Sequence, residues 1–314
     1  MNIFNRSTRR LMHSHSRTRF EQKCIASSNR QEFQPILFDV SLRDGIQGAN
    51  PLDYPTNKKI EIMRTICNVH SPQKIEIGSF VSPKVLPIMS DTEQLLKTAS
   101  TIFRNTNKTA DIYALVPNKT GLLNAIKGGF TNFSFITSVS NAFQIKNTGK
   151  NILYKKTELQ DMMEHISQLK TPAKTKLYIS CINECPLTGL IDNDTIIYEI
   201  LSSYGKSNSP IECDEICLSD TMGTLLHRDF EYIVGGLIRF GVPKSKISVH
   251  LHINQESAKE AKLILFKCFD NGLNRFDVSA ISEGGCSVTM NSNQLKSNMT
   301  YEFFHNALEE WKSL

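Results

Sequence analysis

Residues 36–47 read ILFDVSLRDGIQ, and this stretch determines how the rest of the chain is interpreted. It begins with a short apolar run, Ile36–Phe38, and passes directly into Arg43, Asp44 and Gly45. Such a pattern is typical of a buried strand that ends abruptly in a loop. In parallel α/β folds, ligands bind at the carboxyl ends of the strands. The stretch therefore predicts a first strand followed by a functional loop; an ordinary surface loop is the alternative.

The same rhythm of a short β-rich run, a polar turn and a helical pattern repeats along the chain after Pro35. Eight runs predict strands at 36–40, 75–80, 111–116, 132–138, 176–182, 215–218, 247–253 and 275–281. Helical patterns lie between them at 56–68, 91–99, 120–127, 157–169, 192–204, 228–240 and 256–270. Eight strands alternating with helices over about 280 residues predict an α/β fold, the (β/α)8 TIM barrel. An open doubly wound sheet is the alternative, but it usually has fewer strands, and neither nucleotide-binding glycine motif is present.

Charge and hydropathy limit the classes of function. The net charge of +5 comes from the N-terminus, since residues 1–30 hold seven basic side chains and one acidic side chain. The remaining residues are nearly neutral, which argues against a nucleic-acid-binding surface, and no apolar run is long enough for a membrane span. Residues 1–34 are rich in Arg and Ser and resemble a mitochondrial transit peptide, although a basic tail without a targeting role is the alternative. We therefore expect a leader or disordered tail at 1–34, a barrel domain at 35–314, and a mitochondrial matrix location, with the cytoplasm as the alternative.

Two histidines separated by one residue are the strongest signal for a site. In a strand, residues i and i+2 point to the same side, so His250 and His252 face one way. In a barrel strand that side is the interior, and Asp44 lies at the mouth of the barrel after the first strand. Two imidazoles and a carboxylate are ligands that a divalent metal ion can use. The alternative is a pair of surface histidines on a half-exposed strand.

A second signal is the thiol of Cys286, which ends the sequence SEGGC. Two glycines permit a tightly turned loop after the eighth strand. A thiol on such a loop can act as an acid or a nucleophile, or it can be incidental. The eight cysteines lack the C-x₂-C spacing of a zinc or redox site, so most are expected to be free, buried thiols.

Together these residues resemble the hydroxymethylglutaryl-CoA lyase family, a group of metal-dependent TIM-barrel lyases. The resemblance runs from about Pro35 to about Ala307 and includes DVSLRDGIQ, IEIGSFVSPKVLPIMSD, LVPNKTGLLNAIKGG, YISCINECPLTG, ICLSDTMGT, HLH and GGC. The SFVSPK and GGC segments are more similar to the lyases than to the related synthases. The resemblance implies cleavage of 3-hydroxy-3-methylglutaryl-CoA to acetyl-CoA and acetoacetate, with Mg²⁺ or Mn²⁺ as the cofactor. The expected partner is an acyl-CoA, with no nucleic acid and no membrane, and a homodimer is left open.

The resemblance assigns the metal ligands residue by residue. Asp44, His250 and His252 resemble three of the family's ligands. Asn298 fits the fourth ligand best, because the following residues continue as the family's last helix does, and Asn293 is the second choice. His250 is also counted among the catalytic residues, since a nearby imidazole can take up a proton.

Five further residues receive roles from the same resemblance. Arg43 would stabilise the oxygen of the enolate formed on cleavage and, together with Gln47, would bind the substrate. Cys286 would donate the proton that quenches the enolate. Glu76 and Asp220 would order the polar network around the site.

Three features depart from the family pattern. Ile253 stands where the family usually has an acid, directly after the second histidine. Ser282 and Glu283 open the glycine-rich loop, and a carboxylate beside Cys286 would tend to raise the pKa of its thiol. The chain ends at Leu314, short of the family's usual end, so we expect part of the edge that faces CoA to be missing. These departures keep two alternatives open: a related lyase or synthase for another keto or hydroxy acid, and a non-catalytic barrel that retains the fold.

Overall fold

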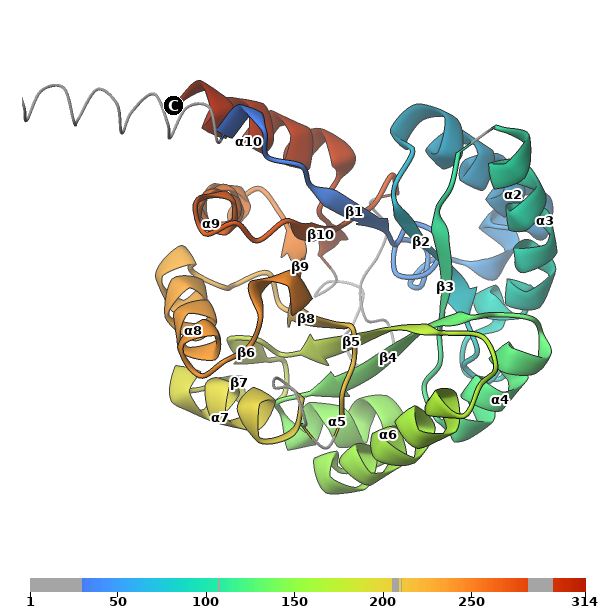
Figure 1. Cartoon of the computed structure of the whole chain (residues 1–314), viewed down its shortest axis with the longest axis horizontal. Helices are drawn as coiled ribbons and strands as arrows, with labels where there is room; N and C mark the ends of the chain where they lie inside the picture. The colour runs from blue at the N-terminus through green and yellow to red at the C-terminus, as the bar shows by residue number, and fades with distance from the viewer. Residues whose placement is uncertain (1–29, 107, 205–208, 210, 282–295) are drawn as a thin grey trace, which may run out of the picture.

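Eight parallel strands form a closed ring in the computed structural model, which describes residues 30–106, 108–204, 209, 211–281 and 296–314 (Figure 1). The ring order is β10-β1-β2-β3-β4-β5-β8-β9, and pairing between β9 and β10 closes it. The strands are β1 (Ile36–Asp39), β2 (Lys74–Ser79), β3 (Asp111–Leu115), β4 (Asn132–Ser138), β5 (Lys174–Ser180), β8 (Glu215–Asp220), β9 (Ile247–Ile253) and β10 (Arg275–Val278). The prediction of a TIM barrel is confirmed.

Helices surround the ring on its outer side (Figure 1). They are α2 (Thr56–Thr65), α3 (Thr92–Asn105), α4 (Lys119–Lys127), α5 (Asn141–Thr148), α6 (Ile152–Ser167), α7 (Asn193–Ser203), α8 (His227–Arg239), α9 (Ala258–Asp270) and α10 (Tyr301–Ser313). Several predicted boundaries are wrong. The helix expected at 157–169 begins earlier, at Ile152, and α5 precedes it. The eighth strand ends at Val278, before the predicted end at residue 281, and Ser279 beyond it forms an isolated bridge with Thr300.

Short strands add to the barrel at its carboxyl end. The hairpin β6 (Glu184–Cys185) and β7 (Gly189–Leu190) follows β5, and β11 (Ser297–Asn298) pairs antiparallel with the end of β9. This last pairing sets Asn298 opposite His252. It therefore ties the segment before α10 to the strand that carries both histidines.

Side chains along each strand point alternately toward the helices and toward the inside of the ring, and the two regions differ in character. Outward-facing side chains such as Leu37 and Ile75 join the main apolar core between the strands and the helices. Inside the ring the apolar side chains form two small clusters, one of Phe38, Val40 and Tyr113 and one of Leu115, Tyr178 and Cys217. Buried charged side chains occupy much of the rest of the barrel interior.

The beginning of the described chain packs on the last helix. Arg30 Nη1 donates to the backbone oxygen of Trp311 at 3.2 Å, and the Phe33 ring lies 5.5 Å from the Trp311 ring and 5.1 Å from that of Phe269. Most of the predicted leader, residues 1–29, lies outside the described residues. The expected boundary at residue 34 stays a prediction, but the last residues before it contact the barrel.

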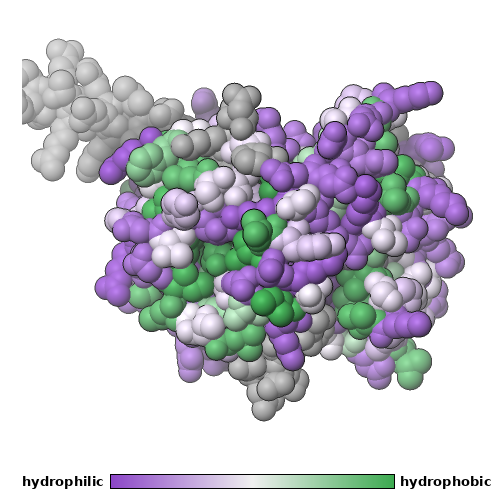
Figure 2. Space-filling model, turned by 90° about the horizontal axis from the view of Figure 1, so that it is seen from below, coloured by the Kyte–Doolittle hydropathy of each residue, from purple (hydrophilic) through white to green (hydrophobic). Residues whose placement is uncertain are grey.

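Hydrophilic and hydrophobic side chains are interspersed on the side of the molecule that carries α5, α6 and α7 (Figure 2). Among the helices that the structure describes, none combines the length and the apolar character that crossing a membrane requires.

Candidate active site

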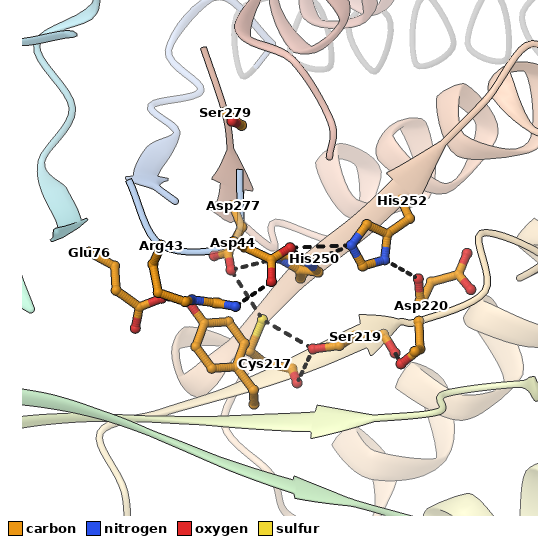
Figure 3. A network of polar contacts seen from close by, with 12 residues as sticks. Arg43, Asp44, Glu76, Cys217, Ser219, Asp220, His250, His252, Asp277 and Ser279 are labelled. Atoms are coloured by element: carbon orange, nitrogen blue, oxygen red, sulfur yellow. Dashed lines mark hydrogen bonds and ion pairs between the residues drawn. The ribbon is translucent and has the colours of Figure 1, made fainter. Parts of the chain in front are cut away.

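Three predicted ligands meet at the carboxyl end of the barrel. Asp44 follows β1, whereas His250 and His252 lie on β9, and all three side chains are buried and point toward one another (Figure 3). His252 Nε2 lies 3.3 Å from Asp44 Oδ2 and 3.4 Å from His250 Nε2, and His250 Nε2 lies 3.6 Å from Asp44 Oδ2. The centre of this triangle is about 2 Å from each atom, close to the usual metal–ligand distance. The described residues thus include a group of ligand atoms that could hold a metal ion.

The remaining ring nitrogen of each histidine contacts an oxygen. His250 Nδ1 lies 3.1 Å from Asp277 Oδ2, and His252 Nδ1 lies 3.0 Å from the backbone oxygen of Asp220. A carboxylate and a carbonyl only accept, so both Nδ1 atoms carry the hydrogen. This tautomer turns the lone pair of each neutral Nε2 toward Asp44, as metal ligation requires.

The electrostatics of the triangle also suit a cation. Burial alone would raise the pKa of Asp44, but Arg43 and the two imidazoles outweigh it and hold that pKa well below its usual value. Burial would lower the pKa of His250, but its hydrogen bonds to Asp277 and Asp44 raise that pKa to about 9. The anionic surroundings thus favour positive charge at this point. A divalent cation can take the place of the proton, since metal binding releases protons from its ligands.

Asn298 offers a fourth ligand. Its side chain is 2% exposed, and neither Oδ1 nor Nδ2 has a hydrogen-bond partner among the described residues. A buried amide without partners is costly, which indicates that something else satisfies it. Because β11 sets Asn298 opposite His252, its amide oxygen suits a metal site next to that imidazole. The second choice, Asn293, lies outside the described residues.

Arg43 is buried beside this triangle and is held on three sides. It forms ion pairs with Asp44 and Glu76, and its guanidinium carbon lies 4.8 Å from the centre of the Tyr178 ring. Tyr178 Oη donates to Glu76 Oε2 at 3.2 Å. Burial opposes the charge of Arg43, but the two carboxylates outweigh it and raise its pKa further. The guanidinium is therefore a fixed, permanent positive charge at the end of the barrel.

Asp220 takes a different place from that expected. Its carboxylate accepts from the backbone nitrogens of Thr224 and Leu225, both at 3.1 Å, and so closes the turn after β8. Burial raises the pKa of Asp220 to about 6 despite these hydrogen bonds. Figure 3 shows the carboxylate directed away from the triangle, while the backbone oxygen faces His252. Asp220 thus orders the site through its main chain.

A cavity of about 250 Å³ opens from the triangle. Arg43, Gln47 and Tyr178 line it, together with the three predicted ligands. Both apolar and polar side chains line the cavity. The apolar ones include Val81, Val85, Leu86, Leu115, Ile136 and Phe143, and the polar ones include Asn118, Asn147, Thr148, Lys150 and Glu158. The cavity can thus admit a molecule with both apolar and charged parts.

One of the departures from the family pattern, Ile253, can be located. Ile253 follows His252 on β9, so its side chain points the other way, and it packs against the main apolar core. It therefore takes no place among the ligand atoms. Glu283 and the predicted proton donor Cys286 lie outside the described residues.

Sequence reasoning missed three residues inside the barrel. Asp277 contacts His250, Tyr178 contacts Arg43 and Glu76, and Lys176 pairs with Asp277. Lys176 and Asp277 are charged residues in otherwise apolar strand patterns, and each faces the barrel interior. That mismatch between charge and pattern is the signal that could have identified them.

Comparison with known proteins agrees with this arrangement. The family model described as HMGL-like matches residues 34–284. The mitochondrial hydroxymethylglutaryl-CoA lyase of Arabidopsis thaliana is 24% identical over 250 residues, which cover 80% of this chain and 50% of the relative. The cytoplasmic 3-hydroxy-3-methylglutaryl-CoA lyase of Homo sapiens is 26% identical over 259 residues, which cover 82% of this chain and 65% of the relative. The chain therefore spans between half and two thirds of the length of these curated relatives.

A solved structure shows the same fold. The HMG-CoA lyase of Acinetobacter baumannii, in complex with coenzyme A and 3-methylmalate, has a TM-score of 0.71 and 23% sequence identity to this chain. The match covers 88% of this chain and 84% of that chain. The structural likeness extends around the barrel, and the family model matches from just before β1 to beyond β10. The protein is therefore a member of the HMGL-like family.

Proposed function

We propose that this protein cleaves 3-hydroxy-3-methylglutaryl-CoA to acetyl-CoA and acetoacetate and that it uses a divalent metal ion. The observation that carries the proposal is the meeting of Asp44, His250 and His252 beside the buried guanidinium of Arg43, at the inner end of a cavity. The names of the curated relatives support this substrate. The coenzyme A in one similar structure supports an acyl-CoA.

Asp44, His250, His252 and Asn298 would hold the metal ion. A bound divalent cation would supply Lewis acidity, which makes the substrate hydroxyl easier to deprotonate. Two nitrogen and two oxygen ligands are compatible with Mg²⁺ or Mn²⁺, and we propose that one of these is used.

The reaction breaks the bond between C2 and C3 of the acyl chain. The hydroxyl on C3 would pass its proton to a nearby imidazole or carboxylate of the site and become the ketone of acetoacetate, while the electron pair of the broken bond moves onto the thioester as an enolate. Arg43 can stabilise the enolate oxygen, because a guanidinium stays charged and lines the cavity here. Glu76 and Tyr178 fix the orientation of the Arg43 guanidinium, so the site needs little reorganisation when negative charge develops on the enolate oxygen.

Protonation of the enolate at C2 completes the formation of acetyl-CoA. We propose that the thiol of Cys286 donates this proton. A general acid positioned to donate this proton contributes about 10²–10⁴-fold to the rate. Gln47 also lines the cavity and would contact the substrate.

Purified protein, incubated with 3-hydroxy-3-methylglutaryl-CoA and Mg²⁺ or Mn²⁺, should release acetoacetate and acetyl-CoA in equal amounts. Chelation of the metal should abolish release, and Arg43→Gln should lower kcat/KM by about 10²–10³-fold. Arg104→Gln on the exposed face of α3 is the matched control. Condensation of acetyl-CoA with a keto acid, without cleavage, would identify a synthase instead. Stoichiometric metal without turnover of any acyl-CoA would identify a non-catalytic barrel.

We also propose that the N-terminal segment, residues 1–34, directs the protein to mitochondria, because residues 1–30 hold seven basic side chains and one acidic side chain. Fusion of these residues to a fluorescent reporter should send the reporter to mitochondria. A diffuse cytosolic signal would contradict the proposal and favour the cytoplasm.

A further inference from the structure

Three buried charged side chains lie inside the barrel and have no role in the reaction described above. They come from three strands: Lys176 on β5, Glu215 on β8 and Asp277 on β10. Their exposed fractions are 0%, 2% and 2%. The interior of a TIM barrel is usually packed with branched apolar side chains, so charges here are unusual.

These charges alternate in sign. Lys176 Nζ lies 3.0 Å from Glu215 Oε1, and it forms an ion pair with Asp277 Oδ1 on its other side. Below them, Glu215 Oε2 accepts from Lys74 Nζ at 2.5 Å and from Arg275 Nη1 at 3.0 Å, where the side chains become partly exposed. A column of ion pairs therefore runs from the amino end of the barrel to Asp277.

The upper end of the column, Asp277, contacts the proposed metal ligand His250. Asp277 Oδ2, the oxygen that Lys176 does not hold, accepts from His250 Nδ1 at 3.1 Å. Figure 3 shows Asp277 next to His250, on the side of the imidazole away from His252. The two histidines are thus held by unlike acceptors, a charged carboxylate for His250 and a neutral carbonyl for His252.

We infer that Asp277 is a positioning residue for the metal ligand His250, and that Lys176 holds Asp277 in place for this role. A carboxylate that accepts from Nδ1 fixes the ring and makes the opposite nitrogen a stronger ligand. A lone buried carboxylate would be costly, and Lys176 offsets that cost from below. Replacing a buried ion pair by apolar side chains is often neutral or stabilising, so stability alone is a weak reason for this column. The inference rests on the proposed metal site.

The test is Mn²⁺ binding to the purified full-length protein in the absence of substrate, measured by titration with electron paramagnetic resonance. Asp277→Asn should raise the Kd for Mn²⁺ by about 10–100-fold, the usual effect of losing such a partner. Lys176→Met should change the Kd in the same direction. Lys176→Arg keeps the charge and should restore binding close to that of the wild type.

Lys59→Met is the matched control for loss of a buried lysine. Lys59 is 2% exposed and pairs with Asp91 at 2.6 Å, but it lies on α2, outside the ring. The Lys59→Met substitution should lower thermal stability and leave the Kd for Mn²⁺ unchanged. If Asp277→Asn fails to fold, the comparison of Lys176→Met with Lys176→Arg still tests the column.

The outcomes separate the two proposals. Asp277→Asn or Lys176→Met could instead bind Mn²⁺ with the Kd of the wild type and only lose stability, as Lys59→Met does. That result would show that the column is purely structural and would overturn this inference alone. A wild-type protein that binds no Mn²⁺ would overturn the proposed metal site together with the inference. Higher Kd values in Asp277→Asn and Lys176→Met, with recovery in Lys176→Arg, would support the positioning role.

Discussion

Asp39 is a buried carboxylate whose contacts make the stability of the barrel depend on pH. Tyr301 Oη, at the start of α10, donates to Asp39 Oδ2 at 2.8 Å. The same carboxylate accepts from the backbone nitrogen and the hydroxyl of Ser41, in the loop that carries the proposed metal ligand Asp44. Tyr301→Phe removes one donor and retains the ring that stacks on His70, 3.8 Å away. The variant therefore isolates a single hydrogen bond.

The sign of the effect follows from the pKa of Asp39. Burial raises this pKa from 3.8 to about 6, and the hydrogen bonds from Ser41 and Tyr301 only partly oppose burial. The folded state thus holds a proton that the unfolded state has lost between about pH 4 and 6. As the pH rises through this window, the free energy of unfolding therefore falls by about 3 kcal/mol, which is about 1.4 kcal/mol for each unit of difference between the two pKa values. Without the Tyr301 hydroxyl the folded pKa is higher still, so the fall extends above pH 6.

The size of the change depends on the charge of Asp39. Near pH 5 the carboxyl is mostly protonated, and Tyr301→Phe should cost about 1 kcal/mol, the net worth of a neutral hydrogen bond. At pH 8 the carboxylate is charged, and the same substitution should cost about 2–3 kcal/mol. Urea unfolding at the two pH values measures both numbers.

Tyr232→Phe is the control, because Tyr232 Oη donates to Asp194 at 2.8 Å on the surface. It should show little pH-dependent change, since water can solvate Asp194. Equal costs for Tyr301→Phe at pH 5 and pH 8 would refute the reasoning about Asp39.

Three further predictions concern the site and the N-terminus. Cys286→Ala should retain metal and substrate binding but lower cleavage by about 10²–10⁴-fold, whereas Cys268→Ala in α9 should leave turnover nearly unchanged; wild-type turnover in Cys286→Ala would exclude this thiol as the donor. His252→Ala should lose stoichiometric Mn²⁺ in equilibrium dialysis, and full retention would place the ligands elsewhere. A protein that starts at Arg30 should melt like the full chain. One that starts at Pro35 loses the contacts with α10 and should be less stable by about 1–3 kcal/mol. Equal Tm values for the two proteins would show that those contacts contribute nothing.

The strands could be predicted because each is a short run of β-branched and apolar residues bounded by polar turns. The same pattern of parallel strands predicts that functional residues lie at the carboxyl ends of the strands. α5 was not predicted, because this helix has eight residues and buries only Phe143 and Gln144, so it lacks a repeated apolar stripe. Its start depends on Ser140, whose side chain accepts from the backbone nitrogen of Phe143.

The relative placement of the two histidines could be predicted because an i and i+2 pair in a strand has only one geometry. The contact between Lys176 and Asp277 could not, since 101 residues separate them and each faces its partner only after the ring forms. The orientation of Asp220 also depends on a local turn. A motif names this residue but does not reveal whether its side chain or its main chain faces the site.

The position of Asp44 and His252 has a consequence for folding. These residues are 208 positions apart and belong to strands that β10 separates in the ring. Neither half of the barrel contains a complete set of ligands, so a cation can gain its full coordination only after the last strands have joined the first. Contacts between distant parts of a chain form late, because ordering the intervening chain is entropically costly. Uptake of a spectroscopically visible cation such as Mn²⁺ during refolding would therefore time the closing of the ring, separately from the growth of secondary structure.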